Sequence, residues 1–135
     1  YMFGGQARTP VVIRTMIGAG VGTGPQHSQI LYPLLVAIPG IKVATPANAA
    51  DAKGLLTTAI REDDPVVFCE HKALYLDECE VPEGDYMIPF GRARTAVEGS
   101  DVTLVGMSRT AVLAEEAAVS LSKKGISAEL AGYLR

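Results

Sequence analysis

Residues 41–69 read IKVATPANAADAKGLLTTAIREDDPVVFC, and in this stretch a helix pattern lies between two strand patterns. Ile41–Thr45 and Val66–Cys69 are short runs rich in β-branched residues, which predicts two buried strands. Asn48 is a suitable helix cap, and Asp51 stands near the positive end of the helix that follows. The apolar face of this helix is predicted to consist of Ala52, Leu55, Leu56, Ala59 and Ile60. A strand–helix–strand order predicts a parallel sheet with a right-handed crossover.

The residues before this unit add to the same pattern. Pro10–Thr15 is a third predicted strand, and within it Arg14 is expected to be a buried charge that needs a partner. The apolar spacing over residues 28–38 predicts a helix, which Pro33 either begins or kinks. The predicted fold class is therefore α/β, a parallel sheet with helices on both faces.

The pattern fails over residues 71–99, which are rich in charge and turn residues. We expect a connector there, with a short extended piece at 90–97. The predicted organisation is one α/β domain at residues 1–75, a linker at 76–98, and the start of a second α/β domain at 99–135.

The second predicted domain opens with its own strand–helix–strand unit. Val102–Gly106 is the first strand, and residues 126–130 are the second. Between them, residues 109–124 form an alanine-rich helix, with Ser108 as its expected N-cap and Gly125 as its stop.

Composition excludes several classes of protein. The 135 residues are 48% hydrophobic and 20% charged, which argues against disorder, and the net charge of −3 argues against a nucleic-acid partner. No apolar run is long enough to span a membrane. Cys69 is expected to be a buried thiol and forms no metal motif with Cys79, so a reducing compartment is expected. Both ends lack the features of natural termini, so we expect an internal piece of a longer protein.

A glycine-rich stretch, GAGVGTGPQHSQ at residues 18–29, follows the first predicted strand. Glycines allow close approach of backbone or ligand, and ligands bind at the carboxyl edge of parallel sheets. The stretch fits neither a dinucleotide fingerprint nor a phosphate loop. His27 is either a helix-entry residue bonded to its neighbours or an acid–base group that Gln26 and Gln29 orient. His71 is expected to be a surface residue.

The acidic run Glu62, Asp63 and Asp64 ends the helix that is predicted to follow Asn48. Such a run is usually a solvated turn, but its carbonyl oxygens could also surround a hard cation. Neither a zinc spacing nor a nucleophile elbow is present. The residues alone thus indicate a cytosolic-type α/β enzyme fragment with one histidine of interest.

Several short motifs occur together and in a specific order. They are YMFGGQ at 1–6, VVIR at 11–14, GAG at 18–20, QHSQ at 26–29, IPGIKV at 38–43, DAKGL at 51–55, AIR at 59–61 and DPVV at 64–67. Together they resemble the beta subunit of the thiamine-diphosphate-dependent 2-oxo acid dehydrogenases, whose members act on pyruvate, branched-chain 2-oxo acids or acetoin. The resemblance implies a transketolase-like pyrimidine-binding domain, a linker, and the start of a transketolase C-terminal-like domain.

The resemblance also implies a mechanism. Thiamine diphosphate carries the electron-sink chemistry, and the acyl unit then passes to a lipoyl group. His27 matches the family's active-site histidine, whose implied role is to handle protons and developing negative charge. The start of the chain and the residues after Arg14 favour the acetoin or pyruvate type.

The family places a monovalent cation, often potassium, beside this site, where it would hold the loop that presents the histidine. The matching positions, used mostly through backbone carbonyls, are Val11, Ala59, Ile60, Glu62 and Asp64. The implied partners are an alpha subunit, which binds the diphosphate and magnesium, in an α2β2 heterotetramer, and a lipoyl-bearing transacetylase. The expected location is the bacterial cytoplasm, or the mitochondrial matrix in a eukaryote.

Two departures from the family pattern affect the loop. Gly22–Pro25 replaces an alanine-rich run, and Pro33 stands where the family continues a helix. Two alternatives stay open: a single-chain enzyme of the transketolase type, and a non-catalytic scaffold for the alpha subunit.

Overall fold

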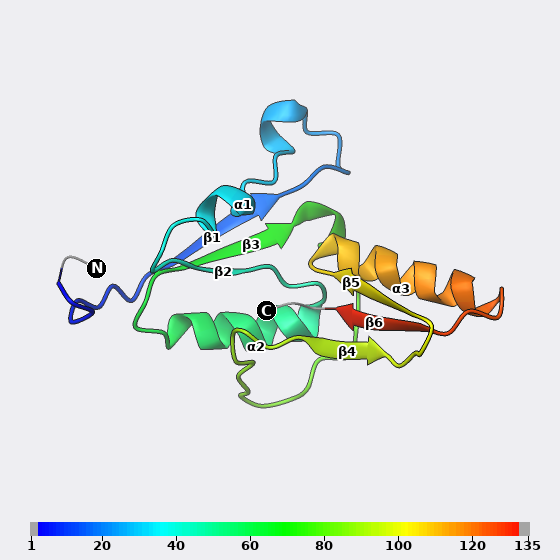
Figure 1. Ribbon diagram of the computed structural model, residues 1–135. Coiled ribbons are helices and arrows are strands. Elements are labelled where there is room, and N and C mark those ends of the chain that lie inside the picture. The colour runs from blue at the N-terminus through cyan, green and yellow to red at the C-terminus, as the bar shows by residue number, and fades with distance from the viewer. Residues whose placement is uncertain (1–2, 133–135) are drawn as a thin grey trace.

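The computed structural model describes residues 3–132, which form two three-stranded sheets joined by an extended connector (Figure 1). Residues 1–2 and 133–135, which include the start of the first motif and the end of the second predicted domain, lie outside the described residues. In chain order the elements are β1 (Val12–Ile17), the 3-10 helix η1 (Pro25–His27), α1 (Tyr32–Leu35), β2 (Lys42–Ala44), α2 (Ala49–Ile60), β3 (Val66–His71), the 3-10 helix η2 (Lys72–Leu74), β4 (Arg94–Val97), β5 (Val102–Gly106), α3 (Arg109–Ser122) and β6 (Ala128–Gly132). None of the helices in this part of the chain has the length and apolarity needed to cross a membrane.

The first sheet has the order β1-β3-β2, and all of its strands are parallel, as predicted. Strand β3 lies in the middle, which explains its unbroken apolar run, because side chains on both of its faces are buried. Val66 and Phe68 pack with Leu55 of α2 on one face. Val67 and Cys69 face the other way, toward Tyr32 and Leu35 of α1. Helices thus cover both faces of this sheet, as the sequence predicts.

Helix α2 begins as the sequence predicts. The side chain of Asn48 accepts a hydrogen bond from the backbone N–H of Asp51, 2.8 Å away, so one free donor of the first turn is satisfied. The expected apolar face is only partly right, because Leu55 and Ala59 are buried whereas Ile60 is 65% exposed. Ile60 is the last residue of the helix.

The helix predicted over residues 28–38 shortens to the four residues of α1. Pro33 stands in its first turn, where a missing N–H does no harm, and the helix ends at Leu35, before Pro39 is reached. Leu34 is 69% exposed and Ile38 47% exposed, so the apolar spacing that suggested a longer helix buries little surface within the described residues.

The connector after η2, residues 75–93, follows α2 closely and forms no helix or strand before β4. The Tyr86 hydroxyl donates to the Ala50 carbonyl at 2.6 Å, and Thr58 donates to the Ile88 carbonyl at 2.7 Å. Gly54 is required at this contact, because a Cβ there would lie 2.6 Å from Ile88. The extended piece expected at 90–97 is confirmed as the shorter strand β4.

The second sheet has the order β4-β6-β5, with β5 parallel and β4 antiparallel to β6. The predicted strand–helix–strand unit is confirmed as β5, α3 and β6. Gly125 ends α3 with a φ of +77°, and the Ile126 N–H bonds the Leu121 carbonyl. Ser108 does occupy the N-cap position, but its buried hydroxyl makes no hydrogen bond there, so the prediction that it caps the helix is wrong. The hydroxyl of Thr110 instead accepts from the Met107 N–H at 3.0 Å.

Candidate functional site

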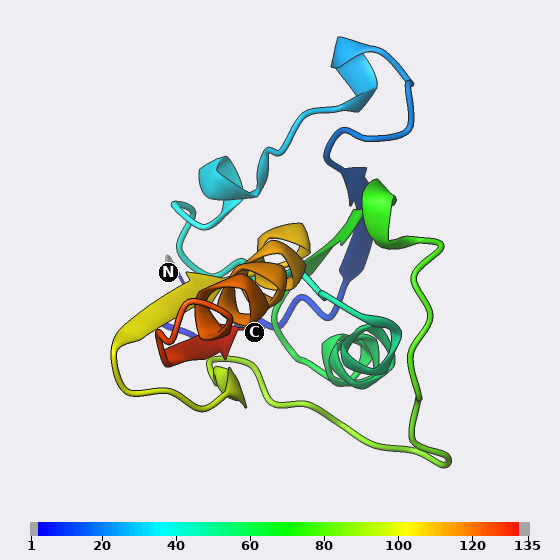
Figure 2. The same ribbon diagram turned by 90° about the vertical axis from the view of Figure 1, so that its right-hand side faces the viewer.

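The glycine loop, residues 18–29, leaves the carboxyl end of β1 and stands above the first sheet (Figures 1 and 2). The loop is closed at its base by a hydrogen bond from the Gly18 N–H to the Gln29 carbonyl, 3.1 Å long. Four of its residues, Gly18, Gly20, Gly22 and Gly24, have positive φ angles between 68° and 121°. Side chains other than glycine rarely adopt this backbone, so the glycine spacing follows from the shape of the loop.

His27 ends the 3-10 helix η1 near the top of this loop, and it is exposed. Its backbone N–H bonds the Gly24 carbonyl, and the Ser28 hydroxyl donates to the same carbonyl at 2.7 Å. Within residues 3–132 its imidazole has no hydrogen-bond partner, so neither Gln26 nor Gln29 orients the ring. The first interpretation of His27, a ring bonded to its neighbours, therefore does not describe this structure.

Lys72 is a residue of this site that the sequence reasoning missed. It opens η2 directly after β3, and it is only 8% exposed. Its ammonium donates to the Thr23 hydroxyl at 2.9 Å and to the backbone carbonyl of His27. A cation placed directly after a buried central strand was the available signal, since that position faces the carboxyl edge of the sheet.

A cavity of about 530 Å³ lies between the glycine loop and the ends of β1 and β3. Its polar lining includes Thr23, His27 and Lys72, and its apolar lining includes Ile17 and Cys69. The volume falls within the range of small-molecule sites. Burial raises the pKa of the Cys69 thiol, which therefore stays protonated near neutral pH and serves as an apolar wall.

His71 is half-buried, so the prediction of a surface position is wrong. Its Nδ1 accepts from the Ala73 N–H at 3.2 Å, and its ring lies so close to Gly18 that a Cβ there would be 2.1 Å from Nε2. Burial, and then the positive charges of Arg109 and Lys72, lower the pKa of His71. The His71 ring, uncharged near neutral pH, packs directly against Gly18 at the start of the loop.

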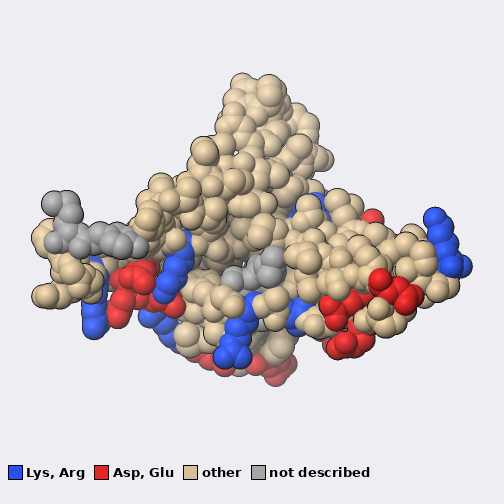
Figure 3. Space-filling model, viewed as in Figure 1, with Lys and Arg blue, Asp and Glu red and all other residues tan. Residues whose placement is uncertain are grey.

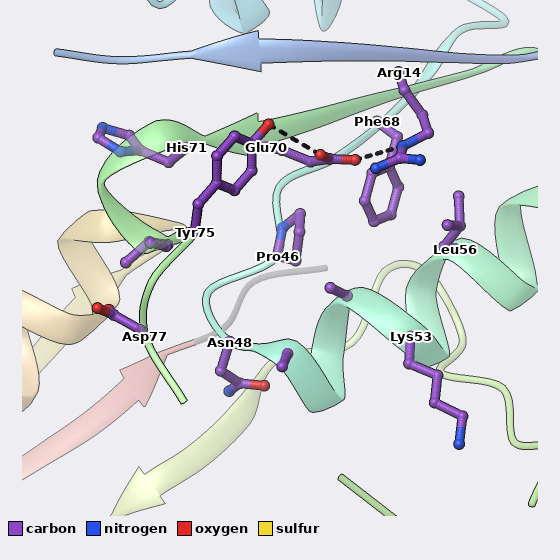
Figure 4. A pocket seen from close by; sticks show the side chains of 13 residues that line it. Arg14, Pro46, Asn48, Lys53, Leu56, Phe68, Glu70, His71, Tyr75 and Asp77 are labelled. Atoms are coloured by element: carbon purple, nitrogen blue, oxygen red, sulfur yellow. Dashed lines mark hydrogen bonds and ion pairs between the residues drawn. The ribbon is translucent and has the colours of Figure 1, made fainter. Parts of the chain in front are cut away.

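A second cavity, of about 370 Å³, lies on the α2 face of the same sheet (Figure 4). Arg14 and Glu70 both line it and form an ion pair at 2.6 Å, and the Tyr75 hydroxyl donates to Glu70 at 3.1 Å. The predicted partner of Arg14 is thus found, but the Arg14 side chain is 61% exposed and not buried. The hydrogen bond and charge of Glu70 raise the pKa of Arg14. His27 does not line this cavity.

The acidic turn, residues 62–64, lies at the opposite edge of the first sheet from the glycine loop, near the amino ends of β1 and β3. The ammonium of Lys42 bonds Glu62 and also pairs with Asp64 at 3.2 Å. The Val11 carbonyl accepts from the Val66 N–H. The positions expected to hold a cation therefore lie near the amino ends of the strands, whereas the loop that carries His27 follows the carboxyl end of β1. No cluster of three or more potential metal ligands (His, Cys, Asp or Glu) occurs in the described part of the chain.

The segment that carries His27, residues 15–41, contains no Asp, Glu, Lys or Arg. The projecting part of the molecule is uniformly uncharged in Figure 3. Large apolar side chains are exposed along this segment, namely Met16, Val21, Ile30, Leu31, Leu34, Val36 and Ile38. An apolar surface of this kind marks a contact with another chain or segment.

Comparison with known proteins places this geometry in a family. The transketolase pyrimidine-binding domain matches residues 1–77, and the transketolase C-terminal domain matches residues 91–132. A solved structure described as a split gene transketolase, inactive beta4 tetramer, has a TM-score of 0.76 and 28% identity, and the match covers 93% of this chain and 39% of that one.

Curated relatives are also similar over most of this chain. The beta subunit of acetoin:2,6-dichlorophenolindophenol oxidoreductase is 56% identical in Cupriavidus necator and 50% identical in Bacillus subtilis, each over 96% of this chain and 38% of the relative. The mitochondrial pyruvate dehydrogenase E1 component subunit beta-1 of Oryza sativa is 45% identical over 96% of this chain and 36% of the relative. The chain thus spans less than two fifths of the length of these relatives.

The resemblance predicted from the short motifs is confirmed by these matches. More than half of the chain aligns with the first domain, and its parallel sheet is of the expected class. The chain belongs to the transketolase pyrimidine-binding domain family.

Proposed function

We propose that this chain is part of the beta subunit of a thiamine-diphosphate-dependent dehydrogenase. The enzyme decarboxylates a 2-oxo acid, or cleaves acetoin, and transfers the acyl unit to a lipoyl group. The observation that carries the proposal is the exposed His27, which the glycine loop holds beside a cavity at the carboxyl edge of a parallel sheet. Family membership and the names of the relatives support the same function.

Acetoin is the substrate that the relatives favour. Identity is higher to the two acetoin oxidoreductase subunits, at 56% and 50%, than to the pyruvate dehydrogenase subunit, at 45%. Acetoin and pyruvate are both small carbonyl compounds that could enter the same site, so activity with the two substrates must be compared directly.

His27 has the properties that the chemistry requires of this chain. Thiamine diphosphate, when bound, supplies the electron sink that cleavage of a carbon–carbon bond beside a carbonyl needs. An imidazole exchanges protons readily near neutral pH, and an N–H on it can donate to an oxygen that gains negative charge. The ring of His27 has no competing hydrogen bond within residues 3–132, so both of its nitrogens can serve a substrate or cofactor.

The apolar surface of the segment that carries His27 supports a site shared with another chain. We propose that an alpha subunit, carrying the diphosphate and magnesium, covers the exposed apolar residues of this surface in an α2β2 heterotetramer. A lipoyl-bearing transacetylase would then reach His27 from solvent. Bacterial cytoplasm, or the mitochondrial matrix in a eukaryote, is the corresponding location.

Two further parts of the proposal concern organisation. The two separate sheets support the division into two domains proposed at 1–75 and 99–135, but β4 (Arg94–Val97), inside the proposed linker at 76–98, belongs to the second sheet. A monovalent cation such as potassium at Val11, Ala59, Ile60, Glu62 and Asp64 would have to use backbone oxygens, because Lys42 already pairs with both carboxylates.

Replacing the histidine tests the proposal. In the complete beta chain assembled with its alpha subunit, His27→Ala is expected to lower acyl transfer to a lipoyl acceptor by about 100-fold to 10,000-fold, with either substrate. Leu76→Ala, which removes an exposed side chain outside this apolar surface, is the control and should leave transfer unchanged.

Each alternative has its own outcome in this experiment. Undiminished transfer by the His27→Ala enzyme would show that the chain is a scaffold. Transfer to a sugar phosphate in place of the lipoyl acceptor would favour the transketolase type, which the solved split gene transketolase makes the second candidate.

A further inference from the structure

The side chain of Lys72 connects the first sheet to the glycine loop. Lys72 is only 8% exposed, yet within residues 3–132 no carboxylate forms an ion pair with it. The acceptors of its ammonium are instead two neutral oxygens, the Thr23 hydroxyl and the His27 carbonyl. Both belong to the loop that presents the imidazole.

The loop has few other attachments. Its base is closed between Gly18 and Gln29, and the remaining backbone hydrogen bonds run within η1 or back to Gly24. In the described chain, the two bonds from Lys72 are the ones that join positions 19–28 to a residue outside the loop. Since glycine has more backbone freedom than any other residue, this stretch needs such an external attachment to hold one shape.

The attachment is strong because each side depends on the other. A buried ammonium is costly unless its donors are hydrogen-bonded, and the loop supplies the oxygens that it needs. A hydrogen bond from a charged donor is shorter and about twice as strong as a neutral one. Moving the loop away would break both of these hydrogen bonds.

We infer that Lys72 is a positioning residue, which fixes the backbone of His27 and thereby sets where the imidazole stands above the cavity. This inference rests on the proposed function, because it assigns the lysine a role in the reaction through His27. Lys72 itself need not touch the substrate. Small displacements of a reacting group cost a large part of the rate, so the effect belongs in turnover and not in substrate binding.

The first test replaces the ammonium without removing the side chain. In the assembled enzyme, Lys72→Met is expected to lower kcat by about tenfold to 100-fold while KM changes by less than about twofold. Lys53→Met is the matched control, since Lys53 also donates to a backbone carbonyl, that of Pro82 at 2.7 Å, but lies on α2 away from the loop. Thr23→Val removes one of the two acceptors and should give a smaller loss of the same kind.

A double variant tells a positioning role from a general loss of structure. If Lys72 acts through His27, the Lys72→Met change should cause little further loss in a His27→Ala enzyme. Full multiplication of the two losses would overturn the inference while leaving the proposed function intact. An active His27→Ala enzyme would instead overturn the proposed function.

Hydrogen exchange tests the attachment whatever the activity proves to be. The amides of His27 and Ser28 are hydrogen-bonded within η1, and Lys72→Met should raise their exchange rates by about tenfold or more, with the α2 amides unchanged. Unchanged exchange at these two amides would refute the positioning role directly.

Discussion

The crossover unit β2–α2–β3 and the glycine loop are held in contrasting ways. The crossover buries Phe68, Leu55 and Cys69 almost completely, and its helix is capped by Asn48. The loop keeps its side chains in solvent and is attached by the closure at its base and by Lys72. The fold is thus stabilised in one region, and a reactive group is presented by another whose shape depends on few interactions.

The largest expected effect contrasts side-chain truncation in the two regions. Phe68→Ala removes a side chain that is 1% exposed, so we expect it to lower the free energy of unfolding by about 3–5 kcal/mol. Leu31→Ala, two residues beyond the loop and 50% exposed, should change it by no more than about 0.5 kcal/mol. Urea unfolding measures both, and similar losses would mean that the exposed segment is packed in solution.

A smaller effect is expected from adding a methyl group at two glycines of the loop. Gly18→Ala places a Cβ 2.1 Å from His71 at a φ of +82°, so it should cost about 3 kcal/mol or more. Gly22→Ala has a φ of +68° but no atom within 4 Å, so only backbone strain of about 1 kcal/mol is expected. Equal losses in thermal unfolding would show that the ring of His71 gives way, and that the loop does not rest on it.

The smallest expected effect is a pH dependence from His71. Its pKa in the folded state lies below the ordinary 6.5, so the unfolded chain binds the proton more readily. The free energy of unfolding should therefore fall as the pH drops through 6.5 toward the lower folded value, and level off below it.

The variant His71→Asn should flatten this slope, because the amide oxygen can still accept from the Ala73 N–H but does not titrate. His27→Asn removes the other histidine, which is exposed, and serves as the matched control. A slope that survives in the His71→Asn chain would have to come from other groups.

The features that the sequence predicted correctly are those that local chemistry decides. The β-branched runs, the Asn48 cap and the Gly125 stop each act within a few residues, and each is found in the structure. Ser108 failed as a cap: it has a φ of +51°, a backbone state that residue type does not reveal, and its hydroxyl makes no hydrogen bond to the first turn. The helix over 28–38 was predicted from apolar spacing, but much of that apolar surface is exposed in the structure and only Tyr32–Leu35 is helical.

Only part of the candidate site could be predicted from the sequence. His27 was found by its motif, whereas Lys72 reaches the loop from 45 positions along the chain, and its place directly after a strand indicates the edge of the sheet but not this contact. The half-burial of His71 likewise depends on Gly18, which belongs to another strand end. Such contacts follow from the pairing of β1 with β3, which only the three-dimensional structure shows.

The ion pair between Arg14 and Glu70 has a consequence for how the chain assembles. Strands β1 and β3 are far apart in sequence, so no tight turn dictates how they align when they first meet. Arg14 lies opposite Phe68, which brings its guanidinium within reach of Glu70 two residues further along. Sliding β3 by one residue would send Glu70 to the other face of the sheet and take Phe68 away from Leu55 of α2, so a mismatched alignment would lose an electrostatic contact and a core contact together.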